Sequence, residues 1–206
     1  MQTIWREVGE RGSGNRRALG RNGRATAPVM IGVLILAALF RPLHTFAQGD
    51  DEAEYQVKLA FLYNFAQFVN WPPEAFRNSS APLEMCVAGQ DPFRGEIEDS
   101  LRSRLVGGHP IEVKRLKAND DPKSCHIIFV RAGDKRLSER ILAAVRGSNT
   151  LTVGESKGFT DVGGVINLTR EENKLRFEIN LDIASQTRLK ISSKLLALAK
   201  IVKTPP

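Results

Sequence analysis

The stretch LEMCVAGQDPFRGEIEDSL, residues 83–101, decides the fold class. Its first seven residues form a short apolar run, which predicts a buried strand. Asp91 and Pro92 follow as a helix N-cap and a proline at the first helical position. Phe93, Ile97 and Leu101 then give the predicted helix an apolar stripe. A strand that passes directly into a helix is the repeating unit of α/β proteins.

The alternation of strands and helices continues along the chain. Further apolar runs predict strands over residues 111–116, 125–130 and 150–153, with a helix over residues 137–145. Two alternating runs, residues 163–169 and 174–180, predict a β-hairpin joined across Glu171, Glu172 and Asn173. Asp182 is then positioned to cap a last helix that carries apolar residues from Ile183 to Val202. The sequence therefore predicts one α/β domain: a largely parallel or mixed sheet flanked by helices, with a C-terminal β-hairpin and a final helix.

Half of the aromatic residues lie in one short segment. EYQVKLAFLYNFAQFVNWPPEAF, residues 54–76, contains seven of the fourteen. Val57, Phe61, Phe65 and Phe68 follow at spacings of four, four and three, which predicts an amphipathic helix that packs its aromatic face under the sheet. Trp71 precedes two prolines that end this helix. Because tryptophan combines an apolar body with a polar tip, Trp71 is a candidate partner contact.

The first 47 residues predict a secretory signal peptide. They contain seven arginines and two acidic residues, and an apolar run of twelve residues, VMIGVLILAALF, follows the basic part. That run is shorter than the roughly twenty residues that span a bilayer. Small residues at Thr45 and Ala47 predict cleavage after Ala47, which leaves residues 48–206 as the exported domain; the alternative is an uncleaved anchor. Without the leader, twenty-three basic residues face twenty-one acidic ones, so nucleic-acid binding is not expected.

Export changes the interpretation of the two cysteines, Cys86 and Cys125. In an oxidising compartment such a pair more often forms a disulfide than a metal site. Buried free thiols remain the alternative. A metal site would need further ligands, and the exported part contains only two histidines, His109 and His126. We therefore expect no metal and no cofactor.

Four segments, taken in order, resemble the YfiR family of bacterial exported proteins. They are AFLYNFAQFVNWP, CVAGQDPF, LTVGESKGFTDVGGVINLTREENKLRFEINL and LKISSKLLALAK, and the resemblance spans residues 54–202. It implies a periplasmic α/β domain without catalytic activity. It also implies that the protein binds and represses the periplasmic part of an inner-membrane diguanylate cyclase, and it leaves homodimerisation open.

The same resemblance gives expectations for individual residues. Cys86 and Cys125 match the positions of a disulfide in the family. Some members have a second cysteine pair near the GF…GG segment, where this chain has Thr160 and Asn167. Thr187 and Arg188 stand where relatives tend to have a glycine, which suggests that the break in the last helix is softer or absent, since glycine visits left-handed conformations freely.

Two surface sites are predicted from residue type. Lys190, Ser192 and Ser193 form a candidate site for a small anion, because a helix that restarts here would present unpaired N–H groups. The alternative is an ordinary amphipathic helix with solvated lysines. Glu171 and Glu172 at the hairpin tip can steer a partner by their charge; the alternative is a solvated turn.

No catalytic motif is visible in the sequence. There is no nucleophile elbow and no His-Glu-x-x-His helix, so no catalytic residue is predicted. Two other functions stay open beside repression of a cyclase. One is a periplasmic small-ligand-binding module that feeds another membrane sensor, such as a histidine kinase. The other is a helper of envelope assembly or an unrecognised enzyme.

Overall fold

The computed structural model describes residues 47–117 and 119–204. The predicted leader and its cleavage site lie outside the described residues, apart from Ala47, where helix α2 (Ala47–Phe68) begins. In these two ranges no helix has both the length and the apolar character needed to cross a membrane.

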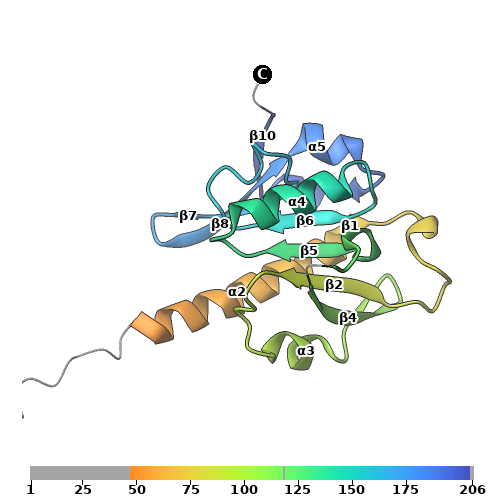
Figure 1. The fold of residues 1–206 in the computed structure, drawn as a ribbon, viewed down its shortest axis with the longest axis horizontal. Coiled ribbons are helices and arrows are strands. Elements are labelled where there is room, and N and C mark those ends of the chain that lie inside the picture. The colour runs from red at the N-terminus through yellow and green to blue at the C-terminus, as the bar shows by residue number, and fades with distance from the viewer. Residues whose placement is uncertain (1–46, 118, 205–206) are drawn as a thin grey trace, which may run out of the picture. The chain divides into compact units, whose positions relative to one another are not determined.

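The central element is an eight-stranded sheet in the order β10-β8-β7-β6-β5-β2-β4-β3 (Figure 1). Neighbouring strands from β4 to β7 are parallel, whereas β3 and β8 join the two ends of this group in antiparallel fashion. The sheet is thus mixed and mostly parallel, and the predicted fold class is confirmed. Its strands are β2 (Leu83–Ala88), β3 (Leu105–Val106), β4 (His109–Leu116), β5 (Ile127–Val130), β6 (Leu151–Gly154), β7 (Ile166–Glu171), β8 (Lys174–Asn180) and β10 (Lys200–Val202).

The strand order reverses beside β2. The chain passes from β2 to β4 on one side and then returns to β5 on the other side. In open α/β sheets, ligands bind outside the carboxyl ends of the strands at such a reversal. The loops that follow Ala88, Val130 and Gly154 are therefore the first place to look for a site.

Helices cover both faces of the sheet (Figure 1). Helix α2 packs on one face, where Leu62 and Phe65 join a core that includes Met85 and Phe129. Helix α4 (Lys135–Val145) packs on the other face, where Ile141 joins Cys86 and Ile128 in a second core. Alternate residues of β2 enter the two cores, as the period of two in a strand requires. Shorter helical segments are η1 (Pro73–Ala75), α3 (Glu96–Leu101) and η2 (Pro122–Ser124).

Helix α3 begins later than the sequence suggested. Its N-cap is Gly95, whereas the Asp91 carboxylate accepts a hydrogen bond from Phe93 N at 2.8 Å in the turn before the helix. The predicted stripe is nevertheless correct, because Phe93, Ile97 and Leu101 are all buried.

The buried stripe of α2 differs from the predicted one. Val57 was expected in the core, but 48% of it is exposed, whereas Phe65 is fully buried. The stripe that faces the sheet repeats at spacings of three and four from Lys58, and its other members are Leu59, Leu62, Phe65, Ala66 and Val69. The prediction of Val57 was wrong because the buried stripe runs through Lys58 and Leu62, one position round the helix from Val57 and Phe61.

The final helix is present but is not continuous. Helix α5 (Leu181–Gln186) and helix α6 (Ser193–Leu196) are separated by strand β9 (Lys190–Ile191), which pairs with β1 (Val69–Asn70) in a two-stranded sheet. The break needs no left-handed residue, since α5 ends at Thr187 with φ −89°. The expectation that the break is absent was therefore wrong, and a break softer than in relatives stays a prediction. The prediction that Asp182 caps this helix was wrong as well. The N-cap of α5 is Asn180, whose Oδ1 accepts a hydrogen bond from Ile183 N at 3.1 Å.

The loop between β6 and β7 depends on two glycines that lie against one aromatic ring. A Cβ added to Gly154 would come within 2.3 Å of the Phe159 ring, and one added to Gly164 would come within 2.2 Å of it. Phe159 is itself 1% exposed, so its ring has little room to move. These two positions therefore accept only glycine.

We predict that Gly164→Ala lowers the free energy of unfolding by about 1–3 kcal/mol, the usual cost of overpacking a core. Urea denaturation measures the change. In a double-mutant cycle with Phe159→Ala, the two substitutions should be coupled, because loss of the ring removes its clash with the new methyl group and leaves only the Phe159 carbonyl oxygen close to it. Additive effects would contradict this account.

Candidate functional site

A buried ion pair lies at the carboxyl edge of the sheet. The Lys58 ammonium of α2 is 2.6 Å from Glu155 Oε2 and 2.7 Å from Glu54 Oε1. Glu155 directly follows β6, and the side chains of Lys58 and Glu155 are only 7% and 6% exposed. Helix α2 is thus tied to the loop in which a ligand site was expected.

Charge-assisted hydrogen bonds extend this ion pair across the reversal in strand order. Glu155 Oε1 accepts from Tyr55 OH and from Ala132 N, each at 3.1 Å. Arg131, the first residue after β5, donates from Nη1 to Gln90 Oε1 at 2.8 Å, and Gln90 lies in the loop after β2. The loops after three adjacent parallel strands therefore converge on one polar network, which we call the α2 network (Glu54, Tyr55, Lys58, Gln90, Arg131, Glu155).

The α2 network holds its charges in fixed states. Burial alone would lower the pKa of Lys58, but the hydrogen bonds to Glu155 and Glu54 outweigh burial and raise it. Burial likewise raises the pKa of Tyr55. Neither group is therefore placed to exchange a proton near neutral pH. Side chains of α2 lie at the carboxyl edge and hold the charged Lys58 against Glu155.

Sequence reasoning missed this network. The sequence analysis assigned no role to Lys58, and Glu155 lies 97 positions away in a loop. One signal was available: Lys58 stands three residues after Tyr55 and four before Leu62, on the stripe that turned out to be buried. A lysine on such a stripe needs a buried carboxylate.

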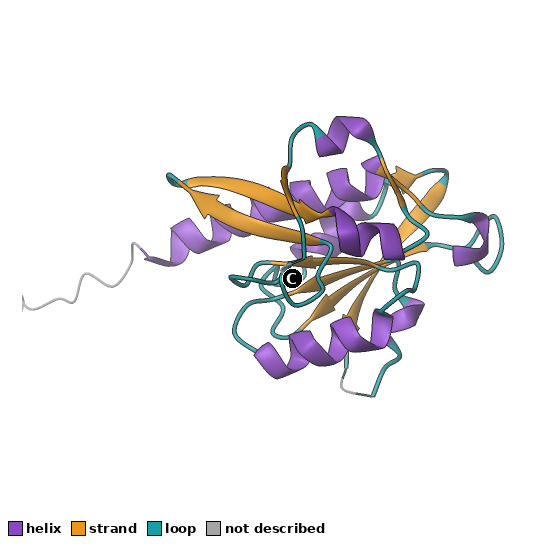
Figure 2. Ribbon diagram, turned by 90° about the horizontal axis from the view of Figure 1, so that it is seen from above, coloured by secondary structure: helices purple, strands orange, loops and turns teal. Residues whose placement is uncertain are grey.

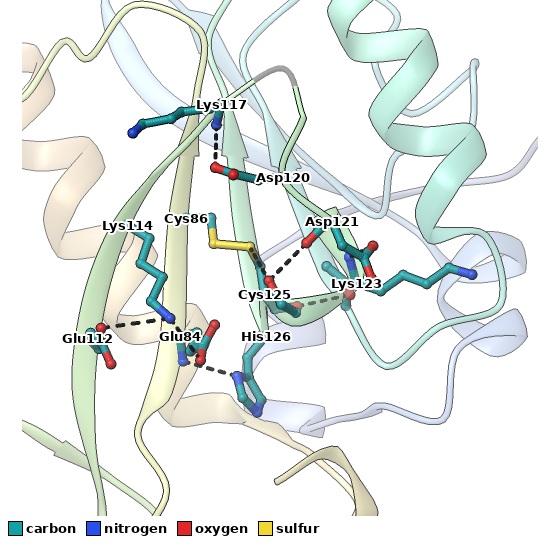
Figure 3. The surroundings of a disulfide bond; sticks show 12 residues. Glu84, Cys86, Glu112, Lys114, Lys117, Asp120, Asp121, Lys123, Cys125 and His126 are labelled. Atoms are coloured by element: carbon teal, nitrogen blue, oxygen red, sulfur yellow. Dashed lines mark hydrogen bonds and ion pairs between the residues drawn. A yellow bond between two sulfur atoms is a disulfide. The ribbon is translucent and has the colours of Figure 1, made fainter. Parts of the chain in front are cut away.

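The amino edge of the sheet is held by the disulfide between Cys86 and Cys125 (Figure 3). In agreement with the expected pairing, the two Cα atoms are 5.9 Å apart. The bond joins β2 to the residue that precedes His126 and encloses a loop of 39 positions, which includes α3 and β4. On loop-entropy grounds such a bond stabilises the fold by about 4 kcal/mol.

The imidazole of His126 is fully engaged beside this disulfide. Its Nδ1 accepts from Glu84 N at 3.0 Å (Figure 3). Its Nε2 lies 3.1 Å from Ala75 O. Only the neutral ring with a proton on Nε2 satisfies both partners. The Phe76 ring stacks between His126 and His109, with centroids 4.4 and 3.8 Å away. The segment between α2 and β2 is thereby held against the sheet, and burial lowers the pKa of His126.

The predicted contact residues lie at opposite ends of the sheet. Trp71 is half-buried at the amino edge, with its ring 6.3 Å from that of His126, and its Nε1 has no hydrogen-bond partner among the described residues. Glu171 and Glu172 are exposed at the hairpin tip, beyond the carboxyl edge. Glu172 and Asn173 form a two-residue turn with φ of 48° and 60°. The two regions are not one site, and both contact roles stay predictions.

The candidate anion site is partly used by the protein itself. A helix does restart at Ser193, but α6 has only four residues. Ser192 caps it, with Leu195 N donating to Ser192 Oγ at 3.4 Å. Lys190 lies in β9 and is exposed. Anion binding here stays a prediction. In the described part of the chain no three His, Cys, Asp or Glu residues gather as metal ligands.

Comparison with known proteins identifies the family. A model of the YfiR/HmsC-like family matches residues 55–200, and the chain belongs to that family. Among solved structures, the chain is similar to a conserved domain protein from Vibrio cholerae O1 biovar El Tor, with 14% sequence identity and a TM-score of 0.43. That match covers 60% of this chain and 55% of the Vibrio protein, so the chain spans about half the length of that relative.

We predict that Glu155→Ala lowers the free energy of unfolding by about 3 kcal/mol, because it leaves Lys58 buried with only Glu54 as a partner. Adding Lys58→Met should recover part of the loss, since no unpaired charge then remains. Glu139→Ala, which removes an exposed carboxylate 3.7 Å from Lys135, serves as the control and should cost less than about 0.5 kcal/mol. Equal losses for Glu155→Ala and Glu139→Ala in urea denaturation would contradict the account.

A second prediction concerns pH. The lowered pKa of His126 means that the folded state binds fewer protons than the unfolded state just below the ordinary histidine pKa of about 6.5. The stabilising contribution of neutral His126 is complete above about pH 6.5 and is lost as the pH falls toward the lower folded value. In urea denaturation at several pH values, His126→Gln should therefore show a shallower loss of stability below pH ~6.5. If the free energies of unfolding of the wild-type protein and of His126→Gln fell equally with pH, this prediction would be contradicted.

Proposed function

We propose that this protein is an exported, non-catalytic regulator that binds the periplasmic part of an inner-membrane diguanylate cyclase and represses it. Membership of the YfiR/HmsC-like family over residues 55–200 carries this proposal, because the match includes nearly all of the predicted exported domain. Residues 1–47 would serve as the cleaved leader that delivers the domain to the periplasm.

The chemistry of the two edges supports a binding role rather than catalysis. The α2 network keeps Lys58 charged, and both ring nitrogens of His126 are already bonded. Side chains with fixed protonation states and complete hydrogen bonding suit a rigid surface for a protein partner. They do not suit proton transfer, which needs a group that can accept and release a proton.

The β7–β8 hairpin is the surface that we assign to the partner. It projects beside the first half of α2 (Figure 2) and is tied to that helix by Arg170, whose Nη1 is 3.1 Å from Glu54 Oε2. Glu171 and Glu172 are exposed at its tip. Charges held on a supported projection steer a partner and fix its register more than they add affinity.

The first experiment measures cellular cyclic di-GMP in the native host. Deletion of the gene should raise the level, because the cyclase would lose its repressor, and a copy supplied in trans should lower it again. An unchanged level, in cells that demonstrably export the protein, would reject repression under those conditions.

A second experiment tests the hairpin in the same cells. Glu171→Lys combined with Glu172→Lys should fail to complement the deletion and should weaken crosslinking to the cyclase, since the steering charge is reversed. Glu139→Lys reverses a carboxylate on α4 that is also exposed and should complement fully. Equal complementation by both variants would remove the hairpin from the contact.

A further inference from the structure

A cavity lies between helices α2 and α3. It has a volume of about 250 Å³, and its apolar lining includes the buried side chains of Leu59 and Leu101. The polar part of its lining comes from both helices and from the turn after α3: Gln56, Tyr63, Asn64, Ser100 and Arg104. An apolar wall with a few polar groups is the usual form of a site for a small molecule.

The guanidinium of Arg104 is held in place by two contacts within the protein. Its Cζ lies over the Tyr63 ring, 4.6 Å from the ring centroid, and its Nε donates to Ser100 O at 3.0 Å. The two Nη groups have no hydrogen-bond or ion-pair partner among the described residues. A carboxylate binds a guanidinium through two parallel N–H···O bonds, and the free Nη groups offer this geometry.

The Tyr63 ring that supports Arg104 is itself fixed. Its hydroxyl oxygen accepts from Gln67 Nε2 at 2.8 Å, and the same nitrogen donates to Leu105 O at 2.7 Å. Leu105 belongs to β3, so the ring is tied to the edge of the sheet. A side chain that is already positioned loses less conformational entropy when it binds a ligand. The free protein therefore holds Arg104 ready for a ligand.

The charge of this cavity is positive. Among the described residues that line it, Arg104 is charged and none is acidic. On α3, the carboxylates of Glu98 and Asp99 are paired with other arginines. Glu52 and Glu96 precede the lining residues of their helices and do not line the cavity themselves. A single cation in an otherwise uncharged lining favours an anion with one negative charge.

We propose that this cavity binds a small monocarboxylic acid with an apolar tail. The carboxylate pairs with the two Nη groups of Arg104, and the tail covers Leu59 and Leu101. The side-chain amide of Asn64 supplies further N–H donors. A phosphate dianion fits less well, because only one cation lines the cavity. The site shares no residue with the anion site predicted from the sequence, and it is a binding function beyond the proposed repression of a cyclase.

An NMR titration that follows the backbone amide signals tests the site, with the exported protein as the cell processes it and sodium hexanoate as the probe. Wild-type protein should bind one molecule per chain, with saturable shifts in α2 and α3. Arg104→Gln removes the guanidinium and should weaken binding about tenfold or more, as expected for the loss of charge-assisted hydrogen bonds. The matched control is Arg102→Gln. The Arg102 side chain is 78% exposed and is paired with Asp99, so this variant should bind hexanoate with unchanged affinity.

Two further probes test the charge and the tail separately on the wild-type protein. Hexanamide has the same tail without the charge and should bind about tenfold more weakly or not at all. Acetate has the charge without the tail and should also bind more weakly than hexanoate, because it buries less apolar surface. The proposal is overturned if millimolar hexanoate causes no saturable shifts in α2 and α3, if hexanamide or acetate binds as tightly as hexanoate, or if Arg104→Gln and Arg102→Gln bind hexanoate equally well.

Discussion

The buried contact between Lys58 and Glu155 is the constraint on which the arrangement of this domain depends. A lysine that is removed from water needs a carboxylate close by. For Lys58 this carboxylate is that of Glu155, the residue directly after β6. The contact therefore fixes how α2 lies along the sheet and which of its side chains enter the core. Well-packed apolar residues could stabilise a core as well as this pair does, so its distinctive effect is to specify one orientation of α2.

That orientation decides where other molecules can bind. Ligands of open α/β sheets usually occupy the reversal in strand order, but here the α2 network fills this position. At the opposite edge, the Cys86–Cys125 disulfide and the neutral ring of His126 hold the segment after α2 in place. Both edges of the central strands thus hold groups of the protein's own, and the projecting hairpin adds a free strand edge beyond the two residue pairs that join β7 to β6.

The sequence predicts the parts of this structure that depend on local pattern. Apolar runs located β2, β5, β6 and the hairpin, and their alternation with helices gave the correct class. The errors involve distant partners. Val57 is exposed because Lys58 is drawn inward by a residue 97 positions away, and β9 interrupts the last helix because its backbone pairs with β1. The spacing of nearby residues puts Lys58 on the buried stripe and so indicates a buried carboxylate, but it does not identify Glu155 as that partner, and nothing local indicates the pairing of β9 with β1.

Glu178 of β8 shows how the loop before β7 is attached to the hairpin without a disulfide. By resemblance, some relatives have a second cysteine pair near the segment that contains Thr160 and Asn167 here. In this chain both of those side chains donate to one oxygen of Glu178. These hydrogen bonds attach the loop to the hairpin, and neither donor is a cysteine. Because a carboxylate only accepts hydrogen bonds, it also turns Asn167 Oδ1 away from itself, and that oxygen is buried without a partner among the described residues.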